Sequence, residues 1–186
     1  MNVYDFDNTV FYGDSTFRFY RYCLKRHPMM LLRLPRLAWD AIFLLKKDKQ
    51  RFKQRAFGFL KTLRDPEGTV NRFWDKNIGR IKPFYLEQKR DDDVIISASP
   101  EFLIVPAMAR LSRARVMASP IDLHTAEYSG PNCHGQEKVR RFREVYGDAA
   151  IDEFYSDSHS DDPLAEIALR AFMVKGDRIF PWPGKA

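Results

Sequence analysis

Two aspartates, two residues apart and almost at the start of the chain, constrain this sequence more than any other feature. The apolar-aromatic run Asn2–Tyr4 predicts a short buried strand, and Asp5 and Asp7 lie at or just beyond its end. Because side chains alternate between the two faces of a strand, residues two apart point the same way. Two carboxylates held together are costly unless a cation neutralises them or one carboxyl keeps its proton. Both a bound cation and a carboxyl group that keeps its proton can take part in a reaction.

Three further polar motifs follow along the chain, each beside an apolar stretch or a predicted helix start. Their side chains are of the types that hold phosphate or a metal ion. With the two aspartates they supply what phosphoryl transfer needs: a nucleophile, charge neutralisation and a proton for the leaving group. The motifs are Ser97 after the β-branched run Val94–Ile96, Lys138 within Gly135–Val139, and Asp157 and Asp161 within Ser156–Asp161.

Each motif also has a purely structural interpretation when it is taken alone. Paired aspartates near a strand end are common turn formers, and Ser97 could begin the turn or helix at Ser99–Glu101. Lys138 could be one of many solvated lysines. The acidic run Asp157–Asp162 could start a helix, because acidic residues favour that end of the helix dipole and Pro163 suits the first helical position. These interpretations do not explain why all four motifs occur in this order.

In order and local setting, the four motifs resemble those of the haloacid dehalogenase superfamily of phosphotransferases, and the resemblance covers nearly the whole chain. It implies that Asp5 attacks phosphorus to form an aspartyl phosphate and that Asp7 is general acid and then general base. It also implies bound Mg²⁺, with Mn²⁺ as an alternative. At two positions where many members have glycine this chain has Ala98 and Ser156, and neither change removes a functional group. The implied phosphate-binding residues are Thr9, Ser97, Ala98 and Lys138, and the implied metal ligands are Asp5, the Asp7 carbonyl, Asp157 and Asp161.

Motif order also predicts the architecture, an α/β fold with a Rossmann-like parallel sheet flanked by helices. Apolar strands alternate with helical stretches such as Phe102–Arg113 and Glu137–Tyr146, which favours right-handed crossovers. Catalytic groups then meet at the carboxyl ends of the strands. The segment between the first two motifs has helical periodicity, and in the superfamily that this chain resembles such an insertion is a small all-helical cap. We interpret residues 14–82 as the cap, and residues 1–13 and 83–186 as the catalytic core.

Charge is divided unevenly between these two parts. Residues 14–82 contain 18 Lys and Arg against 6 Asp and Glu, a balance of +12, whereas the rest contains 13 against 19, or −6; together they give the net charge of +6. A basic cap over an acidic core is expected to draw anions toward the entrance. Arg18 and Arg21, three apart on one predicted helix, are candidates to clamp an anionic substrate group. Further candidates for contact with substrate are Tyr12, Arg72 and Trp74.

The most apolar part of the predicted cap is Pro28–Leu45. Its polar residues Arg33, Arg36 and Asp40 recur at helical spacing, which predicts a helix with one polar stripe. A membrane-spanning helix needs about 20 apolar residues, and each central Arg or Asp costs roughly 2.5–3.5 kcal/mol, so we do not expect a membrane span. Two interpretations stay open: a helix lying in the interface of an anionic membrane, and a helix packed against its neighbours or a second subunit.

Within the superfamily, the chain looks most like the bacterial phosphatidylglycerophosphate phosphatases. The matching stretches are Arg26–Pro28 before the apolar cap helix, Cys133–Lys138 at the third motif and Tyr155–Ser158 leading into the fourth. This resemblance implies a membrane lipid phosphate as substrate and peripheral membrane contact through the basic cap. The alternative is a small soluble phosphomonoester, as in the related phosphoserine phosphatases.

Composition limits the remaining possibilities. With 186 residues, 45% of them hydrophobic, the chain can bury one core and a small accessory unit. Cys23 and Cys133 lack a CxxC spacing, and the first residues lack a signal-peptide pattern, so we expect a cytoplasmic location, with the inner face of the membrane as the alternative. Cys133 and His134 have no second metal-binding pair and are interpreted as a loop detail.

A basic protein with a pI of about 9.3 could also bind nucleic acid, and aromatic and basic residues interleave in the predicted cap. No recognised nucleic-acid motif occurs in the sequence, and an amphipathic helix produces the same interleaving. We therefore expect a phosphatase. A nucleic-acid-binding or partner-binding protein without turnover is the alternative from a different class, and the oligomeric state stays open.

Overall fold

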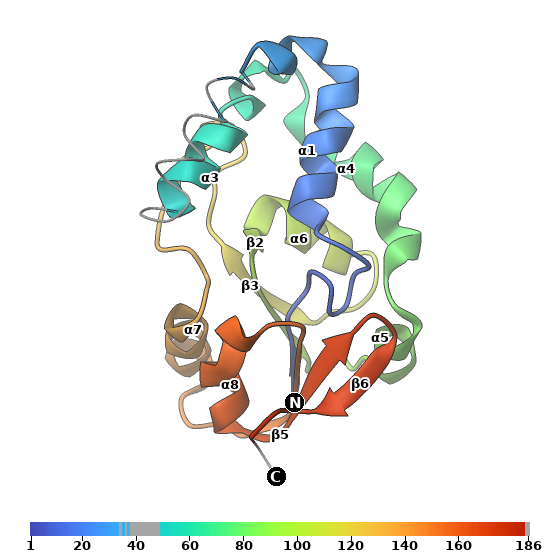
Figure 1. Cartoon of the computed structure of the whole chain (residues 1–186), viewed down its shortest axis with the longest axis vertical. Coiled ribbons are helices and arrows are strands. Elements are labelled where there is room, and N and C mark those ends of the chain that lie inside the picture. The colour runs from blue at the N-terminus through green and yellow to red at the C-terminus, as the bar shows by residue number, and fades with distance from the viewer. Residues whose placement is uncertain (34, 36, 38–48, 185–186) are drawn as a thin grey trace.

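The computed structural model describes residues 1–33, 35, 37 and 49–184. Within them the chain forms an α/β fold around a six-stranded sheet of order β3-β2-β1-β4-β5-β6, in which only β6 runs antiparallel to its neighbour (Figure 1). The first strand of the chain therefore lies inside the sheet, between parallel neighbours. The strands are β1 (Asn2–Tyr4), β2 (Val94–Pro100), β3 (Arg115–Ser119), β4 (Ile151–Ser156), β5 (Ala168–Lys175) and β6 (Arg178–Pro181).

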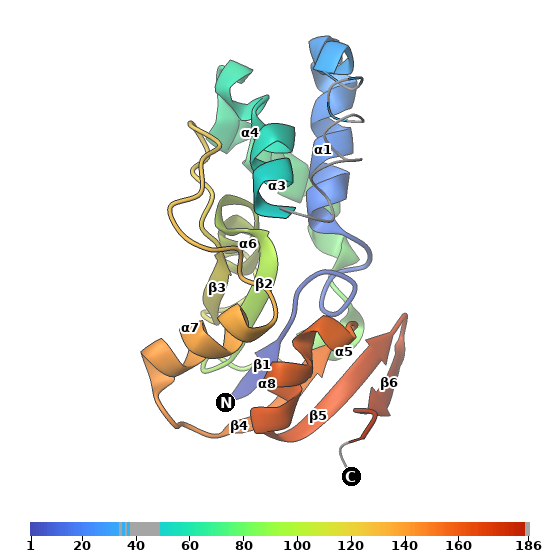
Figure 2. The ribbon, with the colours of Figure 1, turned by 60° about the vertical axis from the view of Figure 1, so that its left-hand side comes forward.

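Both faces of the central strands are buried, and alternate residues contribute to different halves of the core. On β1, Tyr4 belongs to one apolar cluster and Val3 to the other, and on β2 Ile95 and Ile96 divide in the same way. Such near-continuous apolar runs are typical of parallel strands covered on both faces. The covering helices are α5 (Pro83–Gln88) and α6 (Glu101–Met108) on the Tyr4 side, and α7 (Gln136–Tyr146) and α8 (Asp162–Ile167) on the Val3 side (Figure 2).

The part of the chain between residues 15 and 80 that the structure describes is mainly helical and lies above the sheet in Figure 1. Asp14 caps the helix that begins at Ser15, because its carboxylate accepts a hydrogen bond from Phe17 N at 2.7 Å. Asp65 caps the helix that begins at Pro66 in the same way, with Gly68 N as donor at 2.9 Å. Aspartate is a preferred residue at such positions. The predicted α/β fold with helices inserted after the first strand is thus confirmed. The helices are α1 (Ser15–Arg26), α3 (Lys49–Phe57) and α4 (Pro66–Asn77), with 3₁₀ turns at Pro28–Arg33, Leu60–Thr62 and Ile78–Arg80.

Aromatic side chains pack the inserted helices on one another and on the core. Phe19 of α1 meets Phe73 of α4 edge to face, with ring centroids 5.4 Å apart. Trp74 is fully buried and donates its Nε1–H to the Leu103 carbonyl of α6 at 2.8 Å. These helices therefore share one apolar cluster with the Tyr4 face of the sheet.

The predicted apolar helix Pro28–Leu45 is described only in part. Pro28–Arg33 forms a 3₁₀ helix rather than the α-helix that we expected; Pro35 has no N–H with which to continue an α-helical ladder from this turn. Met29 and Leu32 are each 73% exposed. Apart from Pro35 and Leu37, the rest of the predicted helix lies outside the described residues. No helix in the described ranges is both long and apolar enough to cross a membrane.

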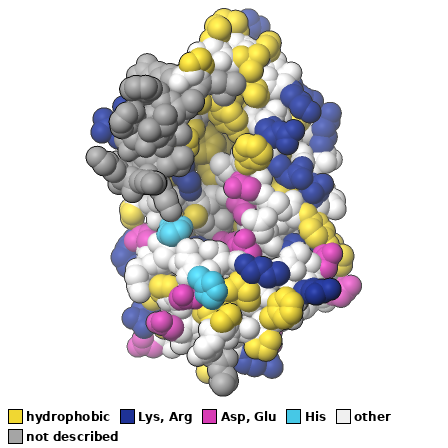
Figure 3. Space-filling model, in the orientation of Figure 1, with side chains coloured by type: hydrophobic (Ala, Val, Ile, Leu, Met, Phe, Trp, Pro, Cys, Tyr) yellow, Lys and Arg dark blue, Asp and Glu magenta, His cyan; other side chains and the backbone are white. Residues whose placement is uncertain are grey.

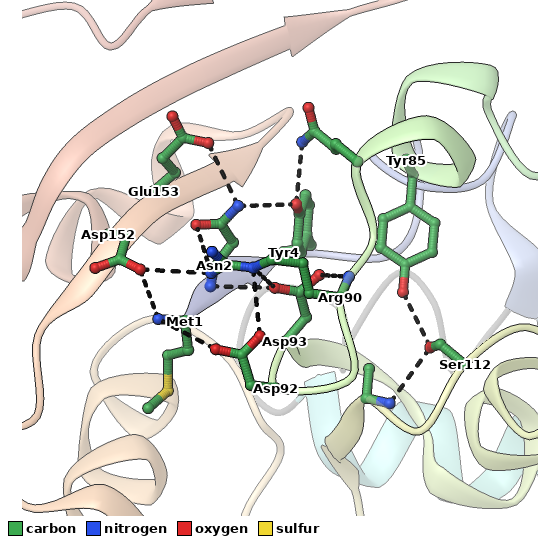
Figure 4. A network of polar contacts seen from close by, with 12 residues as sticks. Met1, Asn2, Tyr4, Tyr85, Arg90, Asp92, Asp93, Ser112, Asp152 and Glu153 are labelled. Carbon is green, nitrogen blue, oxygen red and sulfur yellow. Dashed lines mark hydrogen bonds and ion pairs between the residues drawn. The ribbon is translucent and has the colours of Figure 1, made fainter.

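A polar network joins the amino ends of the parallel strands, remote from their carboxyl ends (Figure 4). The amino group of Met1 donates to Asp152 at 2.7 Å, and Asn2 N donates to Asp93 Oδ1 at 3.2 Å. Arg90 contacts both of these aspartates, at 3.5 Å from Asp93 and 3.4 Å from Asp152. The network links β1 to β4 and to the turn before β2, and so holds β1 in the register that places its carboxyl end at the site.

Candidate active site

A tight turn after β1 brings Asp5 and Asp7 to the same cavity. Asp5 N donates to the Tyr155 carbonyl at 2.9 Å, which extends the pairing of β1 with β4 by one residue. Phe6 is fully buried, and its carbonyl accepts from two backbone N–H groups of the following turn at 2.9 Å each. Anchoring Phe6 in the core leaves the two flanking carboxylates at the carboxyl edge of the sheet, as their spacing predicts.

A buried lysine supports this turn. Asn8 has a φ of 58°, in the left-handed region that asparagine tolerates better than most residues. Lys82, only 2% exposed, donates from Nζ to the Asn8 carbonyl and, at 2.6 Å, to the Gly176 carbonyl. Burial lowers the pKa of Lys82, against the opposing effect of Asp177 and Asp157. Lys82 thereby ties the turn to the β5–β6 hairpin, at the point where the inserted helices rejoin the core.

A cavity of about 200 Å³ opens at the carboxyl ends of β1, β2 and β4. Figure 3 shows acidic side chains near the centre of one face, with basic side chains along the α1 side above them. The predicted site residues that line the cavity are Asp5, Asp7, Ser97, Ala98, Lys138, Asp157 and Asp161. The other lining residues are Asn8, Asp14, Thr16, Lys53, Ser99, His134, Ser158 and Ser160.

Lys138 joins two of the carboxylates. It lies in the first turn of α7, and its Nζ is 2.8 Å from Asp5 Oδ1 and 2.8 Å from Asp161 Oδ2. The same Asp161 oxygen accepts from Ser156 Oγ at 2.7 Å. Burial alone would lower the pKa of Lys138, but the charges of Asp5 and Asp161 outweigh it and raise that pKa. The ammonium therefore stays charged and neutralises part of the acidic cluster.

Burial is the largest influence on the pKa values of two other carboxyl groups of the cavity. Burial raises the pKa of Asp5, Lys138 opposes this rise, and the nearby charges of Asp161 and Asp7 add to it. Burial also raises the pKa of Asp157, against the opposing charge of Lys175. Burial thus outweighs the charge of the nearby lysines, and neighbouring carboxylates add to its effect on Asp5, so a further cation in the cavity would favour the ionised carboxylates.

Asp7 is held by the first turn of α1. Its Oδ1 accepts from Ser15 N at 2.7 Å, and its Oδ2 accepts from Ser99 Oγ, which is in turn 2.8 Å from Thr16 Oγ1. Burial, followed by the charge of Asp14, raises the pKa of Asp7 to about 6 despite these hydrogen bonds. A carboxyl group that titrates near neutrality can both donate and accept a proton, as general acid–base chemistry requires.

The oxygen atoms around the cavity fit a hard divalent cation. Asp161 Oδ1 is buried and has no hydrogen-bond partner in the described structure, although buried polar atoms normally have one. Among the described residues, no three His, Cys, Asp or Glu side chains form a group that could hold a metal ion. Mg²⁺ does not require such a cluster, since it binds through one or two carboxylates together with water and substrate phosphate. The donor set is therefore compatible with Mg²⁺ shared between protein and substrate.

Some predicted residues do not line the cavity. Thr9 is fully buried, and its Oγ1 has no partner among the described residues. Arg18 and Arg21 lie on α1, where Arg18 is partly buried beside Arg80 and Arg21 is exposed. The three further substrate candidates lie elsewhere: Trp74 in the core, Arg72 paired with Asp65, and Tyr12 bonded to Asp177.

The structure also adds residues that the sequence did not single out. Lys53 of α3 reaches the cavity from the predicted cap, although its sequence context is that of an ordinary lysine in a basic helix. His134 lines the cavity as well, where we had interpreted it as a loop detail. Ser99 follows Ser97 by two residues on β2, so the alternation of a strand could have indicated it.

Comparison with known proteins gives a match to a protein family over most of the chain. The sequence profile of the haloacid dehalogenase-like hydrolases matches residues 3–166. Protein CicA, from two strains of Caulobacter vibrioides, is 33% identical over 93 residues, which are 47% of this chain and 40% of CicA. The match therefore spans about two fifths of the length of this relative.

Solved structures share the fold at low sequence identity. A Bordetella pertussis protein of unknown function superposes with a TM-score of 0.74 at 16% identity, covering 92% of this chain and 87% of its own. A phosphoserine phosphohydrolase-like protein from Francisella tularensis has a TM-score of 0.55 at 16% identity, with coverages of 92% and 86%. A HAD family hydrolase from Salmonella enterica serovar Typhi also has a TM-score of 0.55, at 18% identity, with coverages of 89% and 59%.

Proposed function

The chain belongs to the haloacid dehalogenase-like hydrolase family, and we propose that it is a phosphomonoester hydrolase that works through an aspartyl phosphate. The observation that carries this proposal is the cavity in which Asp5, held by Lys138 at 2.8 Å, faces the same space as Asp7. Two carboxyl groups together, beside hydroxyl and ammonium groups suited to phosphate, support the proposed roles of Asp5 as nucleophile and Asp7 as acid–base group.

In the first step, a carboxylate oxygen of Asp5 attacks phosphorus and the bond from phosphorus to the leaving oxygen breaks. Protonated Asp7 donates its proton to that oxygen, so the alcohol leaves neutral. Ser15 N and Ser99 Oγ hold the Asp7 carboxyl in place. Because the pKa of Asp7 is raised to about 6, about one tenth of this group is in the acid form at pH 7, far more than for an ordinary aspartate.

In the second step, water attacks the phosphorus of the aspartyl phosphate. Asp7, now ionised, accepts a proton from that water, and the bond between phosphorus and the Asp5 oxygen breaks. Inorganic phosphate leaves and Asp5 returns to its carboxylate form. The same carboxyl group thus serves as acid in one step and as base in the next.

Lys138 and Ser97 are proposed to bind the transferred phosphate, with the backbone at Ala98 beside it. Ser97 is 2% exposed and accepts from Ser99 N at 3.1 Å, which orients its hydroxyl at the end of β2. The residues that would hold Mg²⁺ are Asp5, the Asp7 carbonyl and Asp157, with Asp161 beside them. When bound, Mg²⁺ would neutralise negative charge on the phosphoryl oxygens.

For the substrate we propose a membrane lipid phosphate such as phosphatidylglycerophosphate, turned over at the inner face of the membrane. Support comes from the +12 balance of residues 14–82 and from the exposed apolar side chains of Met29 and Leu32, close in sequence to Lys25 and Arg26. Apolar and basic side chains together suit an anionic lipid surface. The alternative is a soluble phosphomonoester such as phosphoserine, which fits the name of the Francisella protein that shares the fold.

Phosphate release from a small substrate panel tests both parts of this proposal. The panel contains phosphatidylglycerophosphate in mixed micelles, lysophosphatidic acid, phosphoserine and an aryl phosphate, each with Mg²⁺ and with wild type or Asp5→Asn. We expect release that depends on Asp5 and is fastest with the lipids. Faster turnover of phosphoserine would favour the soluble substrate, and release that does not depend on Asp5 would contradict the phosphatase proposal.

A further inference from the structure

The β5–β6 hairpin points toward the inserted helices (Figure 1) and ends in a turn of defined geometry. Lys175 pairs with Arg178 at the end of the hairpin, so Gly176 and Asp177 form the two-residue turn between them. Gly176 has a φ of 61°, and such short turns need a positive φ, which glycine adopts without steric cost. The turn is therefore a fixed support on which other segments of the chain can rest.

Both linkers between the core and the inserted helices rest on this turn. The linker before α1 and the linker after α4 pair with each other, since Lys82 N donates to the Val10 carbonyl at 2.8 Å. The Tyr12 hydroxyl of the first linker donates to Asp177. From the second linker, Lys82 Nζ donates to the Gly176 carbonyl at 2.6 Å. The turn thus contacts the chain both where it enters the inserted helices and where it leaves them.

The hairpin also contacts the loop after β4, which carries Asp157. Lys175 Nζ donates to the backbone carbonyl of Asp157. Burial raises the pKa of the Asp157 carboxyl, and the charge of Lys175 and a hydrogen bond with the Asn8 side chain oppose this rise. Asn8 and Asp157 both line the catalytic cavity. The Asn8 side chain therefore joins the turn after β1 directly to the loop after β4.

Lys82 closes a ring of contacts through these segments, because its Nζ also donates to the backbone carbonyl of Asn8. The ring runs from Lys82 to Asn8, on to Asp157 and Lys175, and through Gly176 back to Lys82. Lys82 is 2% exposed, and hydrogen bonds from a charged donor are stronger than those between neutral groups. Its ammonium group therefore holds two carbonyls from different parts of the fold at a fixed separation.

Two members of this ring adjoin or supply the proposed ligands of Mg²⁺. Asn8 follows Asp7, whose carbonyl is one proposed ligand, and Asp157 is another. The ring therefore fixes the relative position of two ligands that follow different strands. Mg²⁺ demands near-ideal octahedral geometry, and the outer partners of metal ligands typically contribute about 10- to 100-fold to metal affinity. A shift of one segment against the other is thus expected to weaken metal binding.

We propose that Lys82 is a positioning residue, which sets the Asp7–Asn8 turn against the Asp157 loop and thereby determines how strongly the site binds its divalent cation. This inference rests on the phosphatase function and the Mg²⁺ ligands proposed above. Lys82 does not line the cavity, so it acts through the residues that it holds. Because Lys82 also ends the inserted segment, one side chain ties the inserted helices to the metal-binding loop.

Three variants and one control test the ring. Lys82→Met removes the ammonium group and keeps an unbranched chain of similar length. Lys82→Gln retains a donor for one of the two carbonyls, and serves if Lys82→Met does not fold. Asn8→Gly removes the side chain that bonds to Asp157, but it keeps the backbone carbonyl and suits the φ of 58°. The matched control is Arg90→Met, which removes a cation that ties β1 to its neighbours at the opposite end of the strand.

Metal binding is measured without substrate, at a temperature where each variant is folded. Electron paramagnetic resonance of free Mn²⁺ gives its dissociation constant, and competition with Mn²⁺ gives that of Mg²⁺. We expect Lys82→Met to raise both constants about 10- to 100-fold, with smaller rises for Lys82→Gln and Asn8→Gly. The double variant with Lys82→Met and Asn8→Gly should show less than the product of the single effects, because both changes break the same ring. Arg90→Met should lower stability and leave both constants unchanged.

Two results would overturn the inference. In one, the Lys82 variants lose stability while their dissociation constants equal those of wild type, which would assign Lys82 a structural role alone. In the other, the variants bind the metal ions more tightly, as expected if the only effect were loss of a nearby positive charge. Wild type that binds neither ion would overturn it as well. Failure of the proposed phosphatase function is distinguishable, because phosphate release would then persist in Asp5→Asn, whereas the binding measurement needs no turnover.

Discussion

The ammonium group of Lys138 lies 2.8 Å from Oδ1 of Asp5, and the two side chains are only 2% and 11% exposed. The pair joins the first turn of α7 to the end of β1, which are separated by 133 positions in the sequence. Lys138 also contacts Asp161 at 2.8 Å, so one cation serves two carboxylates. The central groups of the site are therefore held by an ion-pair triad whose members depend on one another.

Removal of the cation should damage both stability and activity. Lys138→Met leaves Asp5 and Asp161 without their partner, and an uncompensated buried charge costs about 3–5 kcal/mol. We expect a loss of stability in that range by denaturant unfolding, together with at least a roughly 100-fold loss in kcat, since the cation would also bind the phosphoryl group. Lys76→Met, at an exposed position of α4, should change stability by less than about 0.5 kcal/mol. Equal effects of the two substitutions would contradict the triad.

The stability of the metal-free protein should depend on pH through Asp7. Its pKa is raised by burial from 3.8 to about 6 on folding, so its proton favours the folded state. This contribution is complete below the unfolded pKa of 3.8 and is lost as pH rises through about 6. In a chelator, Asp7→Asn should therefore be more stable than wild type at pH 8, by on the order of 1–3 kcal/mol, and similar to it near pH 4.

Thermal melts of wild type and Asp7→Asn across this pH range measure the effect. Asparagine keeps an acceptor for Ser15 N and a polar group for Ser99. The two proteins therefore differ mainly in whether residue 7 can ionise, and not in these hydrogen bonds. Asp148→Asn, at an exposed position after α7, is the control and should show no such trend. A stability difference between wild type and Asp7→Asn that is constant with pH would contradict the raised pKa.

Ser99 is expected to position the acid–base group. Ser99→Ala removes the hydroxyl that contacts both Asp7 and Thr16, so Asp7 should protonate the leaving oxygen less effectively. Alkyl leaving groups need that proton more than aryl leaving groups do. We expect kcat to fall roughly 10-fold with glycerol 3-phosphate and less than about 3-fold with an aryl phosphate. The control Ser129→Ala, at an exposed loop position, should affect neither, and an equal fall with both substrates would assign Ser99 a general structural role.

Trp74 should matter for stability and not for substrate binding. Its indole is fully buried and donates to the Leu103 carbonyl at 2.8 Å. Trp74→Phe keeps an aromatic ring but removes the indole N–H that donates to that carbonyl, which should lower the free energy of unfolding by about 1–2 kcal/mol. Steady-state kinetics at a temperature where the variant is folded should give kcat and KM within about 2-fold of wild type. A rise in KM confined to particular substrates would contradict this placement.

The fold and the arrangement of the motifs were predictable because they depend on local patterns. A buried parallel strand is apolar on both faces, as Val3 and Tyr4 show, and polar residues that follow such strands gather at their carboxyl ends. For this reason Asp5, Ser97 and Asp157, far apart in sequence, line one cavity. Their roles in catalysis stay predictions that the experiments above would test.

The contribution of the inserted helices was less predictable. Helical spacing placed Arg18 and Arg21 on one helix, but the burial of Phe19 and Cys23 fixes how α1 faces its neighbours, and neither arginine lines the cavity. Lys53 gave no local signal, since only the docking of α3 on residues 130–132 brings it to Ala98. The orientation of a helix depends on tertiary packing. The helical periodicity of a single sequence does not specify that packing.

The most direct test of the account is to trap the phosphorylated enzyme. A lipid phosphomonoester carrying a radiolabelled phosphoryl group is mixed with wild type or Asp5→Asn in Mg²⁺, quenched in acid within one turnover, and digested for peptide mapping by mass spectrometry. We expect an acid-stable, base-labile phosphoryl group on Asp5 of wild type, and neither label nor phosphate release with Asp5→Asn. Label on another residue, or phosphate release by Asp5→Asn at the wild-type rate, would contradict Asp5 as the nucleophile.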